Sequence, residues 1–410
     1  MQPQLRIDKT RLLQRLEDLA RHGARDDGGV SRLALTDADK AGRDQVVGWM
    51  RELGLEVTID AIGNLHGLRP GRADGPPVMT GSHIDTVAAG GRYDGNYGVL
   101  AGLEVVETLN DAGHVTERPL CVSVFTDEEG ARFAPDMLGS LVFVGAMPLD
   151  EALSIRSADG AVLGEELRRI GYAGDAPVGS TPVHAYVELH IEQGPVLESE
   201  GVTIGAVRDL QGISWQELII EGQANHAGTT PMRLRHDPAY AAGAVIDFVR
   251  GLTERLGGNP LGTCGAIELS PNLINVIPSR ARLTVDLRNT DEAELQRAET
   301  ELAAFTAELA AREGVRLEAR RLARFEPVVF HDRVHKAVGN VARELGYSVQ
   351  DITSGAGHDA QMLARICPAG MIFVPSARGI SHNPAEHTEP ADLEAGANVL
   401  LHTMLALDRG

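Results

Sequence analysis

Histidine and carboxylate side chains follow short apolar runs at several places in this 410-residue chain. The residues concerned are His83, Asp85, Asp94, Glu128, Glu129, His190 and His382. A divalent metal ion that activates water needs neutral imidazoles and ionised carboxylates, with one coordination position left open. A mixed set of these ligands suits Zn²⁺, and also Mn²⁺, Co²⁺ or Ni²⁺. The pattern therefore predicts a metal centre that activates water.

Two local motifs sharpen this prediction. Asp85 stands two residues after His83, where it is placed to hydrogen-bond the second imidazole nitrogen and fix its tautomer. The neighbouring carboxylates Glu128 and Glu129 would repel each other unless a cation neutralised one, which leaves the other free as a general base. Each motif alone is usually a surface or structural feature. It is the repeated placement of such residues after apolar runs that indicates a metal centre.

The elements that must position these side chains alternate between helical and strand patterns in the first 210 residues. Helical periodicity is expected over 8–22, 38–53 and 98–112, and buried strands over 78–81, 120–125 and 184–189. This alternation predicts an α/β fold with a mostly parallel mixed sheet covered by helices on both faces. Ligands usually bind at the carboxyl ends of such strands, where these residues fall.

The pattern changes near Gly212. Strands are expected over 213–222, 262–270, 276–288 and 315–323, and helices over 236–257 and 291–313. The order strand-helix-strand-strand-helix-strand is that of a ferredoxin-like (βαββαβ) domain. Helix and strand alternation then resumes, with a strand over 371–374 and a helix over 391–408. We therefore expect a catalytic domain in two parts, 1–211 and 327–410, interrupted by an inserted domain over 212–326.

Composition excludes several classes of partner. The chain has 38 Lys and Arg against 58 Asp and Glu, a formal net charge of −20, which disfavours nucleic acid and anionic membranes. No apolar run approaches the roughly 20 residues that span a bilayer, and the N-terminal stretch lacks a signal-peptide pattern. The three cysteines are far apart and predict free thiols. We expect a cytoplasmic protein.

Five longer strings resemble the amidase/hydantoinase/carbamoylase branch of the di-metal aminoacylase and carboxypeptidase superfamily. They are GSHIDTVAAGGRYDGNYGVLAG (81–102), FTDEEGARF (125–133), ELHIEQGPVLE (188–198), NHAGTTPMRLRHD (225–237) and VPSARGISHNPAEHT (374–388). The resemblance implies two divalent metal ions per subunit, Zn²⁺ or Mn²⁺ first and Co²⁺ or Ni²⁺ next. It also implies that the inserted domain serves as a lid and as the dimerisation surface of a homodimer.

The resemblance implies a role for each metal-type residue. One ion would be held by His83, Asp94 and His190, and the other by Asp94, Glu129 and His382, with Asp94 bridging. Glu128 matches the general base, and Asp85 the residue that orients a ligand. His358 and His387 compete with His382, which is preferred for its Ser-His-Asn-Pro context after the last core strand. His358 is then expected near the substrate and His387 at the rim of the site.

Residues on the substrate side follow from similar matches. Arg288 is expected to hold a substrate carboxylate through a bidentate fork, with Asn275 as its polar partner. Gln193 is placed to bond a ureido group. His226, on the inserted domain, is expected to reach the partner subunit's site and stabilise the developing oxyanion.

The predicted activity is metal-dependent hydrolysis of the ureido C–N bond of an N-carbamoyl-L-amino acid, which gives the amino acid, ammonia and carbon dioxide. Allantoate amidohydrolase and β-ureidopropionase are the alternatives within the branch, because they use the same metal chemistry. His190 stands where peptidase relatives commonly have a carboxylate, which points away from a general peptidase. A catalytically silent metal-binding scaffold is a remote alternative from another functional class.

Overall fold

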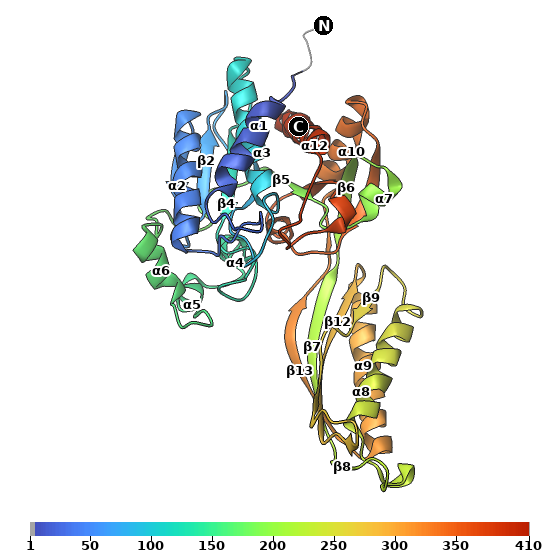
Figure 1. Cartoon of the computed structure of the whole chain (residues 1–410). Coiled ribbons are helices and arrows are strands. Elements are labelled where there is room, and N and C mark those ends of the chain that lie inside the picture. Colours follow the sequence, from blue (N-terminus) through green and yellow to red (C-terminus); the bar gives the residue numbers. More distant parts are fainter. Residues whose placement is uncertain (1–4, 410) are drawn as a thin grey trace. The chain divides into compact units, whose positions relative to one another are not determined.

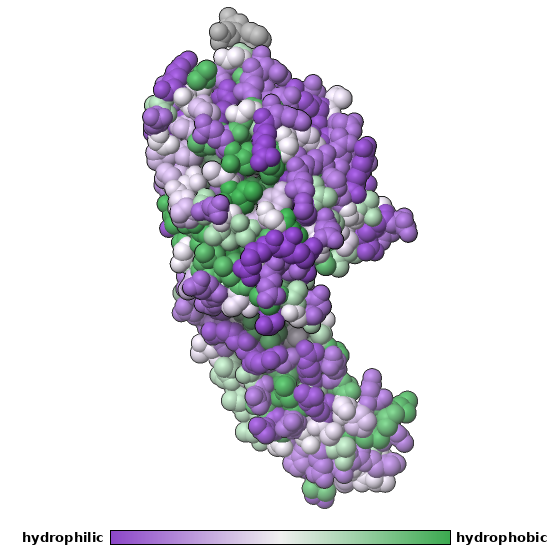
Figure 2. All heavy atoms as spheres, turned by 90° about the vertical axis from the view of Figure 1, so that its left-hand side faces the viewer, coloured by the Kyte–Doolittle hydropathy of each residue, from purple (hydrophilic) through white to green (hydrophobic). Residues whose placement is uncertain are grey.

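The computed structural model describes residues 5–409 and divides into two compact units. The first unit comprises the chain up to Arg208 together with the chain from Phe330 onward, and the second comprises Asp209–Val329. The expected boundaries, at 212 and 326, lie within three residues of these. Figure 1 labels many of the elements of both units, and hydrophilic residues cover most of the face shown in Figure 2.

The first unit is built on a nine-stranded mixed sheet, in the order β1-β2-β4-β3-β5-β16-β6-β14, with β15 also pairing with β6. Its strands are β1 (Glu56–Ile59), β2 (Leu65–Arg69), β3 (Val78–His83), β4 (Leu120–Phe125), β5 (Ala185–Ile191), β6 (Ile204–Leu210), β14 (Val328–Val329), β15 (Val349–Ser354) and β16 (Ala369–Val374). The central strands β4, β3, β5 and β16 run parallel, and β1, β2, β6 and β14 pair antiparallel at the sides.

The parallel centre follows from the sequence of its strands. Every residue of β3, β4, β5 and β16 is buried, as expected for strands covered on both faces. Helices α1 (Lys9–Ala20), α3 (Asn96–Asp111), α10 (Asp332–Glu344) and α12 (Pro390–Asp408) contact one another in series, and α3, α10 and α12 contact the central strands. Helices α4 (Leu138–Phe143) and α11 (Asp359–Leu363) form a second group against β4, β5 and β16. The predicted mixed α/β sheet is confirmed.

Further helices of the first unit are α2 (Asp37–Glu52), α5 (Leu149–Leu153), α6 (Leu163–Ile170) and α7 (Val196–Glu200). Helix α2 begins where the Thr36 side chain accepts from the Asp39 backbone N–H, an N-cap that satisfies a helix-end donor. Helix α12 begins with Pro390, which has no N–H to leave unpaired in the first turn. None of the helices within residues 5–409 has the length and apolar character that crossing a membrane requires.

The second unit has a five-stranded antiparallel sheet, in the order β10-β12-β7-β13, with β9 also pairing with β12. Its elements are β7 (Gly212–Glu221), β8 (Asn225–His226), α8 (Pro238–Thr253), β9 (Leu261–Thr263), β10 (Ile267–Ser270), β11 (Val276–Ile277), β12 (Arg280–Asn289), α9 (Glu292–Glu313) and β13 (Arg316–Phe325). Leu218, Ile220, Leu283 and Val285 of the sheet pack with Val245 and Leu302 of the helices in one core.

Two expected strands of this unit are each divided in the structure. The run 262–270 forms β9 and β10, both paired with β12. The run 276–288 forms β11, which pairs with β8 in a separate two-stranded sheet, and then β12. Pro278 lies between β11 and β12 and has no N–H for a strand ladder, and the next residue, Ser279, donates its N–H to the carbonyl of Ser270.

Candidate active site

Three ligand-type residues of the first unit converge around one carboxylate oxygen. His83 ends β3, His190 lies near the end of the neighbouring β5, and Asp94 lies in the loop before α3. The Oδ1 atom of Asp94 is 3.5 Å from His83 Nε2 and 3.2 Å from His190 Nε2. All three residues are buried. Because β3 and β5 are parallel neighbours, their carboxyl ends deliver the two imidazoles to the same place.

A second group forms around the other oxygen of the same carboxylate. His382 Nε2 lies 3.4 Å from Asp94 Oδ2 and 3.2 Å from Glu129 Oε2. The ligand atoms within each of the two groups lie within 4.8 Å of one another. Asp94 therefore presents one oxygen to each group, the placement expected of a bridging ligand. The five residues predicted as metal ligands lie together in the first unit.

The residues present fit a pair of divalent ions. His83 and His190 each hold Nδ1 against a main-chain carbonyl, of Asp85 at 2.9 Å and of Ile191 at 2.8 Å. A carbonyl only accepts, so each Nδ1 carries a proton and each Nε2 faces the carboxylates. The Nε2 atom of His83 is buried and makes no hydrogen bond of normal geometry within the described residues. Imidazole nitrogens and carboxylate oxygens together are a donor set for Zn²⁺, Mn²⁺ and similar ions.

A third cluster of possible ligands, Glu188, His190 and His358, overlaps the first. The carboxylate of Glu188 already accepts from the Ser82 hydroxyl at 2.7 Å and from the Ala360 backbone N–H at 2.8 Å. Because these two donors already engage its carboxylate, Glu188 is a structural acceptor beside the site. Burial and the nearby histidines His190 and His83 lower the pKa of His358 well below its usual value.

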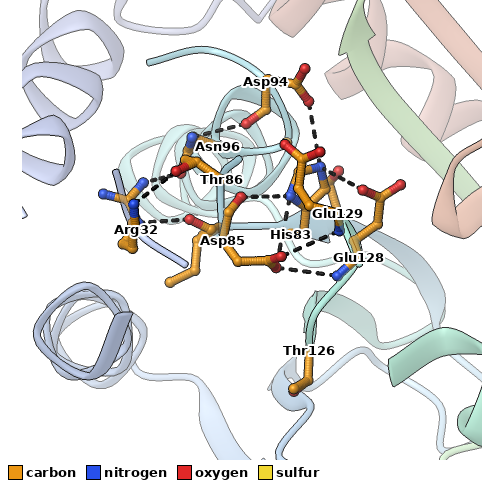
Figure 3. Close-up of polar contacts among 12 residues, drawn as sticks. Arg32, His83, Asp85, Thr86, Asp94, Asn96, Thr126, Glu128 and Glu129 are labelled. Carbon is orange, nitrogen blue, oxygen red and sulfur yellow. Dashed lines mark hydrogen bonds and ion pairs between the residues drawn. The ribbon is translucent and has the colours of Figure 1, made fainter. Parts of the chain in front are cut away.

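The loop that carries Asp94 depends on one glycine and one buried arginine. Gly95 has φ of 65°, and a Cβ added there would lie 2.4 Å from Nε2 of His83. On the other side of the loop, Arg32 donates to Asn96 Oδ1 at 2.5 Å, and Asn96 Nδ2 donates to the Asp94 carbonyl at 2.9 Å (Figure 3). Arg32 is fully buried, so it is a fixed support for the loop that carries Asp94.

Asp85 supports the site in a way that differs from the expectation. Its main-chain carbonyl, and not its carboxylate, accepts from His83 Nδ1; the nearest carboxylate oxygen is 3.9 Å away. The carboxylate instead accepts from the backbone N–H groups of Glu128 and Glu129, each at 3.3 Å (Figure 3). The chain turns directly after β3, which brings the carbonyl to the imidazole and the side chain to the turn after β4. Burial raises the pKa of Asp85 to about 6.

Glu128 lies beside the first group with the properties of a proton acceptor. It is buried, and its Oε2 is 3.3 Å from His83 Nε2. Burial raises the pKa of Glu128 well above its usual value, and Asp359 and Glu129 add to the rise while His83 opposes it. A carboxyl group whose pKa is raised binds a proton more readily than an ordinary carboxylate, as a group that takes a proton and returns it must.

The three histidines and Asp94 stabilise each other's charged forms. Burial alone would raise the pKa of Asp94, but the imidazoles of His190, His382 and His83 around its carboxylate hold it well below its usual value. Hydrogen bonds to Asp94 and Glu129 raise the pKa of His382 to about 10. A metal ion that binds here must replace protons on imidazole, because a protonated nitrogen has no lone pair for a ligand bond.

Two predicted substrate-side residues lie close to these ligands in the first unit. Gln193 donates its side-chain Nε2 to Asp94 Oδ2 at 2.7 Å, while its Oε1 is buried with no partner among the described residues. His358 stacks at an angle against His190, with ring centroids 4.5 Å apart. Both side chains therefore border the proposed metal site.

The other three predicted residues belong to the second unit. His226 in β8 and Asn275 just before β11 are exposed, and β8 pairs with β11. Arg288 lies in β12, where its Nη2 donates to Asp286 Oδ2 at 2.8 Å. Their roles in oxyanion and carboxylate binding stay predictions.

The structure also adds residues that the sequence did not single out. Glu386 accepts from the Tyr93 backbone N–H at 2.9 Å, and Ser381 donates to Asp94 Oδ2 at 2.8 Å. Burial, with a contribution from the charge of Asp94, raises the pKa of Glu386 to about 7. Both residues lie in the string that carries His382. A buried position cannot be read from one acidic residue in a polar loop, so no sequence signal marks Glu386.

Comparison with known proteins shows which protein family the chain resembles. The model of peptidase family M20/M25/M40 matches residues 79–406. An amidase of the hydantoinase/carbamoylase family from Burkholderia multivorans has a solved structure with TM-score 0.97 and 48% identity, covering 100% of both chains. An N-carbamoyl-L-amino acid amidohydrolase of Geobacillus stearothermophilus is 44% identical over 98% of this chain and 100% of its own length. An allantoate amidohydrolase of Bacillus subtilis is 35% identical over 97% and 98%.

The chain belongs to peptidase family M20/M25/M40. Within this family it is an amidohydrolase, as its similarity to the named enzymes over nearly their whole length shows. The resemblance seen in the five sequence strings is thereby confirmed, and so is the prediction that the protein is an enzyme.

Proposed function

We propose that the protein hydrolyses the ureido C–N bond of N-carbamoyl-L-amino acids with two divalent metal ions. One observation carries the proposal: Asp94 offers one carboxylate oxygen to His83 and His190 and the other to His382, with buried Glu128 beside them. The similarity to a carbamoyl-amino-acid amidohydrolase, at 44% identity, supports the substrate class.

The proposed mechanism assigns a step to each group of residues. His83, Asp94 and His190 would hold one ion, and Asp94, Glu129 and His382 the other; such ions supply Lewis-acid activation of water and of a carbonyl. Zn²⁺ and Mn²⁺ are the first choices for this donor set. Glu128 takes a proton from the attacking water and returns it to the leaving nitrogen as the C–N bond breaks. Cleavage of the bond to the amino-acid nitrogen releases the amino acid and carbamic acid, and the remaining C–N bond of carbamic acid then breaks to give carbon dioxide and ammonia.

Substrate orientation is assigned to residues of both units. Arg288 and Asn275 would bind the substrate carboxylate, because a planar guanidinium matches two carboxylate oxygens. Gln193 would bond the ureido group through its unpartnered Oε1, and His226 would stabilise the oxyanion. His358 would line the substrate side of the ligands.

We also propose a homodimer formed through the second unit, which completes each site with His226 of the partner subunit. The second unit exposes large apolar side chains, among them Tyr240, Ile246, Leu273 and Ile274. Burial of these side chains against a second copy of the chain would remove apolar surface from water. Sedimentation velocity at micromolar concentration is expected to give a single species of twice the chain mass, and a monomer would contradict the proposal.

A substrate panel tests the proposed activity. The protein is treated with a chelator, reloaded with Zn²⁺ or Mn²⁺, and assayed for ammonia release from N-carbamoyl-L-methionine, its D-enantiomer, allantoate and N-carbamoyl-β-alanine. The L-carbamoyl amino acid is expected to have the highest kcat/KM, and chelated protein to be inactive until reloaded.

Each of the other outcomes identifies an alternative. A higher kcat/KM for allantoate would make the protein an allantoate amidohydrolase, the activity for which its 35% identical relative is named. Preference for N-carbamoyl-β-alanine would indicate a β-ureidopropionase. Bound metal without ammonia release from any ureido acid would favour a catalytically silent scaffold.

A further inference from the structure

Glu386 is a buried carboxyl group that touches the metal-type residues without being one of their predicted ligands. It lies between β16 and α12, in the segment that carries His382, and is 6% exposed. Its Oε1 accepts from the backbone N–H groups of Tyr93 at 2.9 Å and Asp94 at 3.3 Å. A charged residue type so completely buried requires specific partners to offset its desolvation.

The second oxygen of Glu386 continues the network to the carboxylate of Asp94. Ser381 Oγ lies 3.0 Å from Glu386 Oε2 and 2.8 Å from Asp94 Oδ2. The Ser381 hydroxyl is therefore within donating distance of both carboxylates and bridges Glu386 to Asp94. Asp94 is thereby held at its main chain and at its carboxylate by the same residue pair.

The loop before α3 is shaped to receive this side chain. A Cβ added at Gly91 would lie 2.1 Å from Oε1 of Glu386, so the loop accommodates the carboxyl group because residue 91 has no side chain. Tyr93 and His387 make an edge-on ring contact at 6.4 Å between centroids, which joins the same two segments a second time. The two segments are almost 300 residues apart in the chain.

The contacts distinguish Glu386 from a metal ligand. Both of its oxygens are engaged by the donors already named, and it belongs to none of the candidate metal groups found among residues 5–409. What it does instead is fix the bridging carboxylate relative to the segment that presents His382.

We propose that Glu386 is a positioning residue for the second metal site: through Tyr93, Asp94 and Ser381 it sets the distance between the bridging ligand Asp94 and the ligand His382. The inference rests on the proposed two-metal function of the site. Removing partners that orient ligands typically weakens metal binding by about 10–100-fold. Metal binding at the first site, held by His83, Asp94 and His190, is expected to be weakened less.

The test compares Glu386→Ala, Glu386→Gln and Ser381→Ala with the wild-type protein by calorimetric titration of metal-depleted full-length chain with Mn²⁺. Glu386→Ala is expected to weaken one of the two binding steps by at least ~10-fold and to change the other less. Glu386→Gln is expected to bind within a few-fold of wild type, because its amide accepts from Tyr93 and Asp94 and donates to Ser381. Glu344→Ala is the control, since Glu344 is an exposed glutamate at the end of α10, outside this network.

A second readout separates positioning from general damage. With Glu386→Ala, kcat is expected to recover towards wild type as Mn²⁺ is raised, and thermal unfolding of the metal-depleted proteins checks that the variants fold. If Glu386→Ala does not fold, Ser381→Ala takes its place in the test and is expected to show a smaller loss of metal affinity at the same binding step. Two wild-type-like binding steps in Glu386→Ala, or a loss in Glu386→Gln as large as in Glu386→Ala, would overturn the proposal.

The outcomes also separate this inference from the proposed activity. Wild-type protein that binds two ions but releases no ammonia would refute the activity and leave the role of Glu386 testable by titration. Wild-type protein that binds fewer than two ions would refute both.

Discussion

Replacing Gly95 with alanine is a direct test of how the loop before α3 builds the site. Gly95 has φ of 65° and ψ of −49°, a conformation that residues with a side chain rarely adopt. The added Cβ would lie 2.4 Å from both Nε2 and Cε1 of His83 and 2.5 Å from Cδ2. The change therefore strains the backbone and brings the new Cβ into collision with the imidazole of His83.

The magnitude follows from these two effects. A side chain at a sparsely populated backbone conformation costs about 1–3 kcal/mol. Overpacking of a rigid, buried neighbour costs about 1–3 kcal/mol more. A loss of about 2–6 kcal/mol corresponds to a fall in Tm of at least roughly 4 °C, at the 2–4 °C per kcal/mol typical of larger domains. Displacement of His83 is also expected to reduce bound metal below two ions per chain.

The assay is thermal unfolding of metal-depleted Gly95→Ala protein, with metal content measured after reloading and dialysis. Gly48→Ala is the matched control, because Gly48 lies inside α2 with no neighbouring atom within 4 Å of the added Cβ. There alanine is expected to stabilise the helix by about 0.5–1 kcal/mol. Unchanged Tm and two retained ions in Gly95→Ala would refute this account of the loop.

Three further predictions concern metal and substrate. A metal ion must replace the proton of His382, whose pKa is raised to about 10, so Mn²⁺ affinity is expected to rise between pH 6.5 and 8, by about tenfold per pH unit for each proton displaced. Calorimetric titration at several pH values measures this affinity, and a constant affinity would contradict the prediction. His382→Ala is expected to retain one of two ions, and loss of both by elemental analysis would refute separate sites. Arg288→Lys is expected to raise KM about 10–100-fold with a smaller change in kcat, since one charge-assisted hydrogen bond is worth about 1.5–3 kcal/mol. An unchanged KM would show that Arg288 does not bind the substrate carboxylate.

Sequence reasoning located the candidate ligands because parallel strands end at a common edge of the sheet. His83 and His190 follow strongly apolar runs, so the strands β3 and β5 could be predicted together with what lies at their ends. The sequence could not show which atom of Asp85 faces His83, because the turn after β3 decides that. It could not show the contact of Glu386 with Asp94, since nothing local marks a pairing between such distant segments.

The fold was predictable where apolar patterns are continuous and less so elsewhere. Strands β1 and β2 are short, and β1 alternates exposed and half-buried residues, so neither stands out from a polar loop. The split between β9 and β10 at Cys264–Ala266 was not visible, since its cause is pairing with β12. The βαββαβ order of the second unit was visible, because its long helices α8 and α9 follow clear capping residues, Asp237 and Asp291.

In the proposed mechanism, the buried carboxyl group of Glu128 transfers the proton in metal-dependent ureido hydrolysis. The most direct measurement is ammonia release from N-carbamoyl-L-methionine by Glu128→Gln protein whose metal content has been determined in the same sample. If Glu128 is the general base, the variant retains two bound ions and its kcat is lowered by at least ~10²-fold, the scale of losing a general base. Two bound ions with turnover near that of wild type would contradict it.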